Sequence, residues 1–290
     1  MPNTVARTLK TQRSGKILVT VPDIANPFFA QILQGAEDAA QAVGYAVLLG
    51  DTQHQPDRKE GYAQMLRRNE ADGLIVLGHR LPPTAREIVQ ALGAAAPVVS
   101  GCEFDPALGI PSVHIDNAAA ARAVMEHLYG LCHERIAVVG GPPDNPLHQQ
   151  RLEGVRAAGK ARGRLRSLHV APGDFSVESG HAAALALLSG TPVPTALFCF
   201  SDQMAPGALA AFRDRGIRVP EELSIVGFDD LASSRYLSPP LTTVRQPMRE
   251  IGTRAVNLLL AIIERVDVPL QQTLDFSVML RGSTAPPRAG

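Results

Sequence analysis

Polar and aromatic side chains follow the apolar runs of this sequence at regular places. In chain order they are Asn26, Phe28 and Phe29; Asp116 and Asn117; Arg151; Asp174 and Phe175; Ser201 and Asp202; Asp229 and Asp230; and Gln246. Aromatic rings stack on the apolar faces of sugars and bases, while carboxylates, an amide and a guanidinium bind hydroxyl groups. The set therefore predicts a site for a polyhydroxylated small molecule.

Helix capping is an alternative explanation for part of this set. Asp116, Ser176, Asp202 and Asp229 each stand where the N-cap of a helix is expected, and short polar side chains are preferred there. Capping alone can explain any one of them. The recurrence of such residues after seven apolar runs favours a pocket.

Patterns typical of catalysis are absent from the sequence. Gly140-Gly141-Pro142-Pro143 follows an apolar run, but proline lacks the amide N–H that would bind a phosphate. His133-Glu134 is expected at the surface, and the adjacent Asp229 and Asp230 are expected to point apart. We therefore expect a protein that is not an enzyme and that has no cofactor.

The three cysteines, at positions 102, 132 and 199, form no C-x-x-C pair. A disulfide framework or a metal site is therefore not expected, and isolated cysteines are typical of a reducing cytoplasm. No apolar run approaches the roughly 18 residues that span a bilayer. The first apolar stretch stops at Pro22-Asp23, so we expect no export signal, no membrane partner and a cytoplasmic location.

An alternation of strands and helices must position the candidate residues. Short runs rich in Val, Ile and Leu predict strands at 17–21, 46–49, 73–77, 98–100, 112–115, 136–139, 168–170, 196–200 and 224–228. Amphipathic segments predict helices at 28–43, 117–130, 152–162, 177–188 and 203–216. Near-continuous apolar strands are typical of parallel sheets, so the alternation predicts a doubly wound α/β fold. Ligands of such folds bind at the carboxyl ends of the strands.

The length and the charge of the chain indicate its domain organisation. A chain of 290 residues with 45% hydrophobic residues fits two globular lobes. The formal net charge is zero, so the body gives no sign of a basic nucleic-acid-binding face. Only the first 22 residues are basic without an acid, with Arg7, Lys10, Arg13 and Lys16. A solvated, frayed terminus is one interpretation of this stretch.

Motifs along nearly the whole chain resemble the effector-sensing core of the LacI/GalR (lactose/galactose repressor) family of bacterial transcription regulators. They lie at residues 5–9, 21–29, 72–75, 140–142, 151–154, 201–205, 219–230, 240–244 and 282–284. The resemblance implies two Rossmann-like lobes of the periplasmic-binding-protein type I, with an effector cleft between them. We expect residues 1–15 to be a hinge-helix remnant and linker, residues 16–128 plus 247–275 the N-terminal lobe, and residues 129–246 plus 276–290 the C-terminal lobe.

The resemblance also implies roles for the candidate residues. Phe28 and Phe29 would flank the ring of the ligand, Asn26 would shape their loop, and Phe175 would stack on the base or sugar. The remaining polar residues would bind hydroxyl groups or complete the polar set; they are Asp116, Arg151, Ser201, Asp229 and Gln246.

The N-terminal segment resembles the family's hinge helix over residues 3–10. Val5, Ala6 and Leu9 would contact DNA, with Leu9 inserted into the minor groove as an apolar wedge. A helix-turn-helix head is expected to precede Pro2 in the intact protein, whose homodimer would bind two operator half-sites. The present chain is not expected to bind an operator specifically. The effector would act by its different affinity for two arrangements of the lobes.

Within the family, the strongest resemblance is to the cytidine-repressor subfamily. It rests on residues 50–55, 77–82, 113–117, 145–148 and 173–175, although Cys102 stands where a polar pocket residue is expected. A ribonucleoside such as cytidine is therefore the expected effector. Two alternatives stay open: a pentose- or hexose-responsive regulator of the same family, and a periplasmic solute-binding protein, which shares the fold but not the hinge-like Val5–Leu9.

Overall fold

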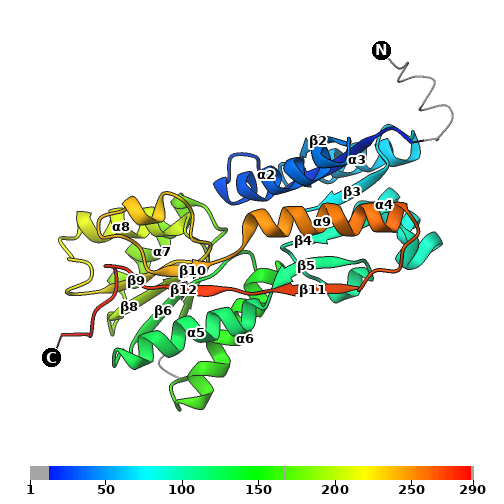
Figure 1. Ribbon diagram of the computed structural model, residues 1–290. Coiled ribbons are helices and arrows are strands. Elements are labelled where there is room, and N and C mark those ends of the chain that lie inside the picture. The colour runs from blue at the N-terminus through cyan, green and yellow to red at the C-terminus, as the bar shows by residue number, and fades with distance from the viewer. Residues whose placement is uncertain (1–12, 166–167, 289–290) are drawn as a thin grey trace. The chain divides into compact units, whose positions relative to one another are not determined.

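The computed structural model describes residues 13–165 and 168–288, and the chain divides into two compact units (Figure 1). Unit 1 comprises the described residues up to His114 together with Pro247–Leu274. Unit 2 comprises Ile115–Gln246 and the described residues from Asp275 onward. The chain therefore passes from one unit to the other three times. The predicted hinge residues Val5, Ala6 and Leu9 lie outside the described residues.

Unit 1 is built on a six-stranded sheet in the order β11-β5-β4-β3-β1-β2. The strands are β1 (Lys16–Val21), β2 (Ala46–Asp51), β3 (Gly73–Val76), β4 (Val98–Gly101), β5 (Ser112–Ile115) and β11 (Gln271–Leu274). The pairs β1–β2, β1–β3, β3–β4 and β4–β5 are parallel. Ile17, Leu18 and Val19 are almost completely buried, as expected of an apolar strand covered on both faces.

The described helices that accompany this sheet are α2 (Pro27–Ala42), α3 (Pro56–Arg67), α4 (Pro83–Leu92) and α9 (Met248–Ile263). The long helix α9, orange in Figure 1, packs along β3 and β4 and against α2. Two glycines allow the close approach of α2 and α9. A Cβ atom at Gly252 would lie 1.9 Å from the carbonyl oxygen of Ile32, and one at Gly35 would lie 2.0 Å from that of Arg249. These helices therefore touch backbone to backbone.

Unit 2 contains a parallel four-stranded sheet in the order β7-β6-β8-β9. The strands are β6 (Ile136–Val139), β7 (His169–Ala171), β8 (Ala196–Cys199) and β9 (Ser224–Val226), and β10 (Thr243–Arg245) pairs antiparallel with β12 (Ser277–Met279). The helices are α5 (Asn117–Gly130), α6 (Pro146–Ala161), α7 (Val177–Ser189) and α8 (Met204–Asp214). Its core includes the fully buried Phe198, Phe200, Phe212 and Phe228.

Several sequence-based expectations need correction. Residues 115–128 belong to unit 2 rather than to the N-terminal lobe, because α5 packs against α6 of that unit. Helix α6 begins at Pro146 rather than Leu152, since Asn145 caps it and Pro146 occupies its first turn. His133 is 2% exposed rather than superficial, because its Nε2 lies 2.9 Å from the carbonyl oxygen of Ala285.

The remaining features of the fold are short 3-10 helices and the cysteines. In the described part of the chain, 3-10 helices follow α4, β4 and β9: η1 (Gly93–Ala95), η2 (Pro106–Leu108) and η4 (Ser234–Tyr236). Among the described residues, no helix is long and apolar enough to cross a membrane, and no group of histidine, cysteine and acidic side chains is arranged to hold a metal ion. Cys102 and Cys199 are buried and Cys132 is exposed, all as free thiols.

Candidate functional site

A buried arginine in unit 2 is the centre of the candidate site. Arg151 lies on α6 and is 2% exposed. Its Nε donates to Oδ1 of Asn117 at 3.0 Å, and its Nη1 donates to the carbonyl oxygen of Phe200. The guanidinium carbon lies 3.7 Å from the centre of the Phe228 ring, a cation–π geometry. The guanidinium is thus held in one orientation from three sides.

Asp229 is the acidic partner of this arginine. Its Oδ1 lies 3.9 Å from Nη2 of Arg151 and accepts a hydrogen bond from Nε2 of Gln246 at 2.7 Å. Burial raises the pKa of Asp229 to about 8, although the positive charge of Arg151 acts to lower it. The positive backbone φ of Asp229, 122°, is rare for a residue with a Cβ atom. The three predicted residues Arg151, Asp229 and Gln246 therefore lie together.

The raised pKa of Asp229 predicts a pH-dependent stability. The folded state keeps a proton that the unfolded chain releases above about pH 4, so this contribution is complete below pH 4 and is lost as the pH rises through about 8. Relative to Asp229→Asn, we expect the wild-type free energy of unfolding to fall by up to about 1.4 kcal/mol per pH unit between pH 5 and 8. Urea denaturation at several pH values measures this difference.

The control for this experiment is Asp214→Asn, which changes an exposed carboxylate at the end of α8. It measures the effect of replacing a carboxylate by an amide at an exposed position, against which the effect of Asp229→Asn is compared. A constant difference between the wild type and Asp229→Asn over the same pH range would show that Asp229 is ionised throughout that range in the folded protein.

Asp230, the next residue, faces other partners. Its carboxylate accepts from Nε of Arg245 at 2.7 Å and from Nη2 of Arg281 at 2.5 Å. It therefore holds β10 and the segment after β12 in place. The expectation that Asp229 and Asp230 point apart is confirmed, and Asp230 has a structural function.

Asp202 supports the loop that carries Asp229. Its carboxylate accepts from the backbone N–H of Leu231 at 2.9 Å, from Oγ of Ser234 at 2.5 Å and from Oγ1 of Thr243 at 2.6 Å. Burial raises the pKa of Asp202, and these hydrogen bonds oppose the shift. The N-cap interpretation is thus wrong for Asp202, because its carboxylate bonds to residues 231–243 and not to the first turn of α8.

Phe175 lies on the loop between β7 and α7 and is half-buried. A Cβ atom on Gly141 would lie 2.0 Å from Cζ of Phe175, so the ring packs directly on the backbone of the loop after β6. Oγ of Ser201 lies 3.4 Å from the carbonyl oxygen of Phe175, which fits a role for Ser201 in positioning this loop. Ser176 caps α7 by accepting from the N–H of Ser179.

Two predicted residues of the site act as helix caps. Asp116 is exposed and accepts from the N–H of Ala119 at 2.8 Å at the start of α5. In unit 1, Asn26 accepts from the N–H of Phe28 at 3.0 Å at the start of α2. Phe28 and Phe29 are each 6% exposed, with ring centres 5.2 Å apart in an edge-to-face arrangement. The pair is therefore buried and is not presented to solvent.

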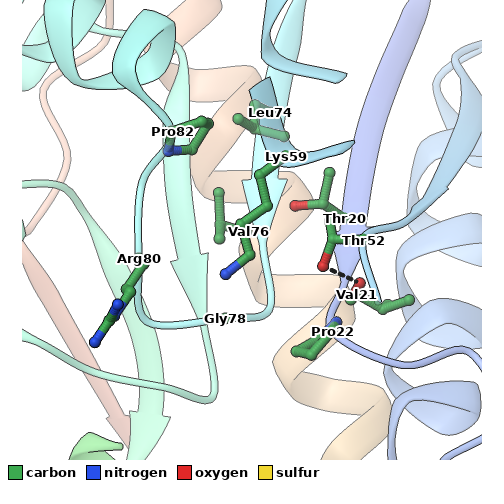
Figure 2. A pocket seen from close by; sticks show the side chains of 10 residues that line it. All are labelled: Thr20, Val21, Pro22, Thr52, Lys59, Leu74, Val76, Gly78, Arg80 and Pro82. Atoms are coloured by element: carbon green, nitrogen blue, oxygen red, sulfur yellow. Dashed lines mark hydrogen bonds between the residues drawn. The ribbon is translucent and has the colours of Figure 1, made fainter. Parts of the chain in front are cut away.

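Unit 1 also contains a pocket at the carboxyl ends of β1, β2 and β3 (Figure 2). Its lining consists of Thr20, Val21, Pro22, Thr52, Lys59, Leu74, Val76, Gly78, Arg80 and Pro82. Burial lowers the pKa of Lys59, while the nearby Glu103 acts to raise it. None of these residues was predicted from the sequence as a site residue, although the subfamily stretches 50–55 and 77–82 include Thr52, Gly78, Arg80 and Pro82.

Comparisons with known proteins agree with this architecture. A family model described as periplasmic binding protein-like domain matches residues 125–284. The HTH-type transcriptional repressor CytR of Escherichia coli (strain K12) is 40% identical over 286 residues, which cover 98% of this chain and 83% of that protein.

Solved structures give the same result. The lac repressor dimer bound to operator and the anti-inducer ONPF has a TM-score of 0.87 at 28% identity, covering 98% of this chain and 99% of that one. A LacI family transcriptional regulator from Enterococcus faecium with bound ribose has a TM-score of 0.84 at 27% identity, with 94% and 100% coverage.

Proposed function

Because the chain belongs to the LacI family of transcriptional regulators, as an effector-binding core, we propose that unit 2 binds a ribonucleoside such as cytidine and that this binding controls repression. The observation that carries the proposal is the buried group of Arg151, Asp229 and Gln246. A charged donor, a carboxyl group and an amide, all held in place, suit the adjacent hydroxyl groups of a ribose.

Phe175 would distinguish a nucleoside from a free sugar. Its half-buried ring rests on Gly141, so one face is supported by backbone atoms. An aromatic ring held in this way stacks on a flat base, a contact that contributes about 1–3 kcal/mol where single-stranded nucleic acids bind proteins. Ser201 and Asp116 would complete the polar contacts of the ligand.

A sugar-responsive regulator is the second candidate. The ribose-bound regulator from Enterococcus faecium shares the fold of this chain, and the polar group around Arg151 would bind the hydroxyls of a pentose equally well. The distinction depends on the base, because only a nucleoside offers a flat ring for Phe175.

DNA binding and dimerisation complete the proposed function. In the intact protein, Val5, Ala6 and Leu9 would contact the operator, and two copies would bind its half-sites. Asn26, Phe28 and Phe29 of unit 1 stay predicted ligand contacts. The effector would change repression only through different affinities for two conformations of the core.

Calorimetric titration with cytidine, uridine, adenosine, ribose and hypoxanthine tests the effector class. We expect saturable binding of a ribonucleoside at micromolar concentration and no heat from ribose. Phe175→Leu should weaken nucleoside binding by about tenfold, in line with the loss of one stacking contact. Val177→Ala, an exposed substitution two residues away, should leave the affinity unchanged.

Binding of ribose alone would replace the nucleoside with a sugar and would leave the regulator family unchanged. Equal affinities of the wild type and Phe175→Leu for a nucleoside would remove Phe175 from the site.

A further inference from the structure

A second cavity lies on unit 1, between the loop after β3, helix α4 and the 3-10 helix η2. It has a volume of about 400 Å³. Its lining consists of His79, Arg80, Leu81, Arg86, Val89, Gln90, Asp105, Ala107 and Leu108. All of these residues belong to unit 1, so the cavity is complete within that unit. None of them is among the effector-site residues proposed above.

The lining of this cavity contains more positively than negatively charged side chains. Arg80 and Arg86 contribute two guanidinium groups, and Asp105 contributes the single carboxylate. Oδ1 of Asp105 accepts from the N–H of Ala107 at 2.9 Å and so caps η2. Nη2 of Arg86 donates to the carbonyl oxygen of Leu81 at 3.1 Å. This bond fixes the Arg86 guanidinium at the wall and leaves further N–H donors for a ligand.

His79 also lines this cavity, and its imidazole is held by a buried carboxylate. Its Nδ1 lies 3.0 Å from Oε2 of Glu103, which is 5% exposed. Since a carboxylate accepts, the hydrogen of this pair is on Nδ1. Nε2 of His79 is buried and has no hydrogen-bond partner, the one such side-chain nitrogen or oxygen in residues 13–165 and 168–288. Because solvent does not reach this nitrogen, the imidazole supports the wall of the cavity through its contact with Glu103 and does not donate to a ligand.

Lys59 is near enough to Glu103 for the two charges to interact. The electrostatic effect of Glu103 raises the pKa of Lys59 against the lowering effect of burial, which places the two charges close to each other. Figure 2 shows the Lys59 side chain beside Val76, with Arg80 projecting from the loop beyond Gly78. With the charge of Glu103 offset by Lys59, the carboxylate leaves no excess negative charge to repel an anion.

We propose that this cavity is a binding site for a compact oxyanion, a phosphate or carboxylate group, separate from the nucleoside site. The anion accepts hydrogen bonds from the Arg86 and Arg80 guanidinium groups. Leu81, Val89 and Leu108 give the cavity an apolar side, so the natural ligand is an organic molecule that carries such a group.

Titration with inorganic phosphate tests the site, in a phosphate-free buffer at constant ionic strength. Acetate in place of phosphate distinguishes the carboxylate from the phosphate, and chloride reports the effect of ionic strength alone. We expect saturable binding of phosphate or acetate with a shift of the His79 Cε1 resonance in NMR spectra of protein with ¹³C-labelled histidine. A linear response without saturation, equal for the three anions, would overturn the proposal.

Two exposed arginines of unit 1 provide the matched variants. Arg86→Ala should weaken oxyanion binding by at least about tenfold, because it removes a charge-assisted hydrogen bond. Arg254→Ala on α9 removes an exposed arginine that pairs with Glu250 and should leave the affinity unchanged. Equal losses of oxyanion affinity in both variants would show a general effect of protein charge and would contradict a specific binding site.

The last measurement repeats the oxyanion titration in the presence of saturating cytidine. Oxyanion affinity should be the same with and without the nucleoside, and displacement of the oxyanion would contradict the separation of the two sites. The oxyanion titration does not depend on nucleoside binding, so failure of the proposed effector and failure of this site are distinguishable.

Discussion

Arg151→Ala should lower the free energy of unfolding by about 3–5 kcal/mol, because two buried acceptors, Oδ1 of Asn117 and the Phe200 carbonyl oxygen, lose their charged donor. The substitution leaves Asp229 with Gln246 as its side-chain partner and removes donors from Asn117 and from the Phe200 carbonyl. It also removes the guanidinium from the face of the Phe228 ring. Urea denaturation followed by far-ultraviolet circular dichroism measures the loss, since the chain has no tryptophan.

Ligand binding by this variant is a second measurement. Effector affinity should fall by about 1.5–3 kcal/mol through the loss of charge-assisted hydrogen bonds. Arg156→Ala removes an exposed arginine of the same helix and should change neither quantity. Wild-type effector affinity in folded Arg151→Ala would remove Arg151 from the ligand site and leave it a purely structural role. Arg151→Met, which keeps an unbranched chain over Phe228, separates lost packing from lost hydrogen bonds.

Gly252→Ala should destabilise unit 1 by about 3 kcal/mol, at the upper end of the usual cost of overpacking. The new Cβ atom would lie 1.9 Å from the Ile32 carbonyl oxygen and 2.7 Å from the Ala36 nitrogen. Both are backbone atoms of α2, so no side-chain rotation relieves the clash and the two helices must separate. Thermal or urea denaturation measures the loss.

Gly61→Ala is the matched control in the same unit. A Cβ atom at this position in α3 meets nothing within 4 Å. Alanine in an exposed helix interior is favoured over glycine by roughly 0.5–1 kcal/mol, so this variant should be slightly more stable than the wild type. Replacing glycine by alanine is thus expected to destabilise the protein at position 252 and to stabilise it at position 61. Similar small effects in both would contradict the backbone contact of α2 and α9.

Strong hydrophobic patterns were sufficient to predict strands β1 to β9 and helices α2 and α5 to α8, but α3, α4, α9 and β11 were not predicted. The predicted helix at 117–130 has the observed ends of α5, because Asp116 caps it and an apolar periodicity follows. The start of α6 was missed, since its first turn carries the polar His148, Gln149 and Gln150. The strands β10 and β12 have three residues each, too short for a periodicity to show.

The candidate site was predictable only in part. The rule of strand ends identified Asp229 and Gln246, but local sequence does not distinguish a capping carboxylate from a buried one. Asp116 caps a helix and stays exposed, whereas Asp202 is buried under three hydrogen bonds from residues 231–243. That difference depends on packing with a segment about 30 residues further along the chain. His79 and Glu103 escaped notice for the same reason, since 24 residues separate them.

The three passages of the chain between the units determine the order in which a ribosome can complete them. Helix α9 and strand β11 belong to unit 1 but are made after almost all of unit 2. Until residue 274 has left the ribosome, the nascent unit 1 lacks the edge strand β11. It also lacks a complete α9–β11 segment, in which α9 is the helix that packs on β3, β4 and α2. Domains usually fold from the N-terminus as they are synthesised, but here the N-terminal half must wait for the C-terminal end of the chain. During that interval, an apolar surface of unit 1 is open to chaperones and to other nascent chains.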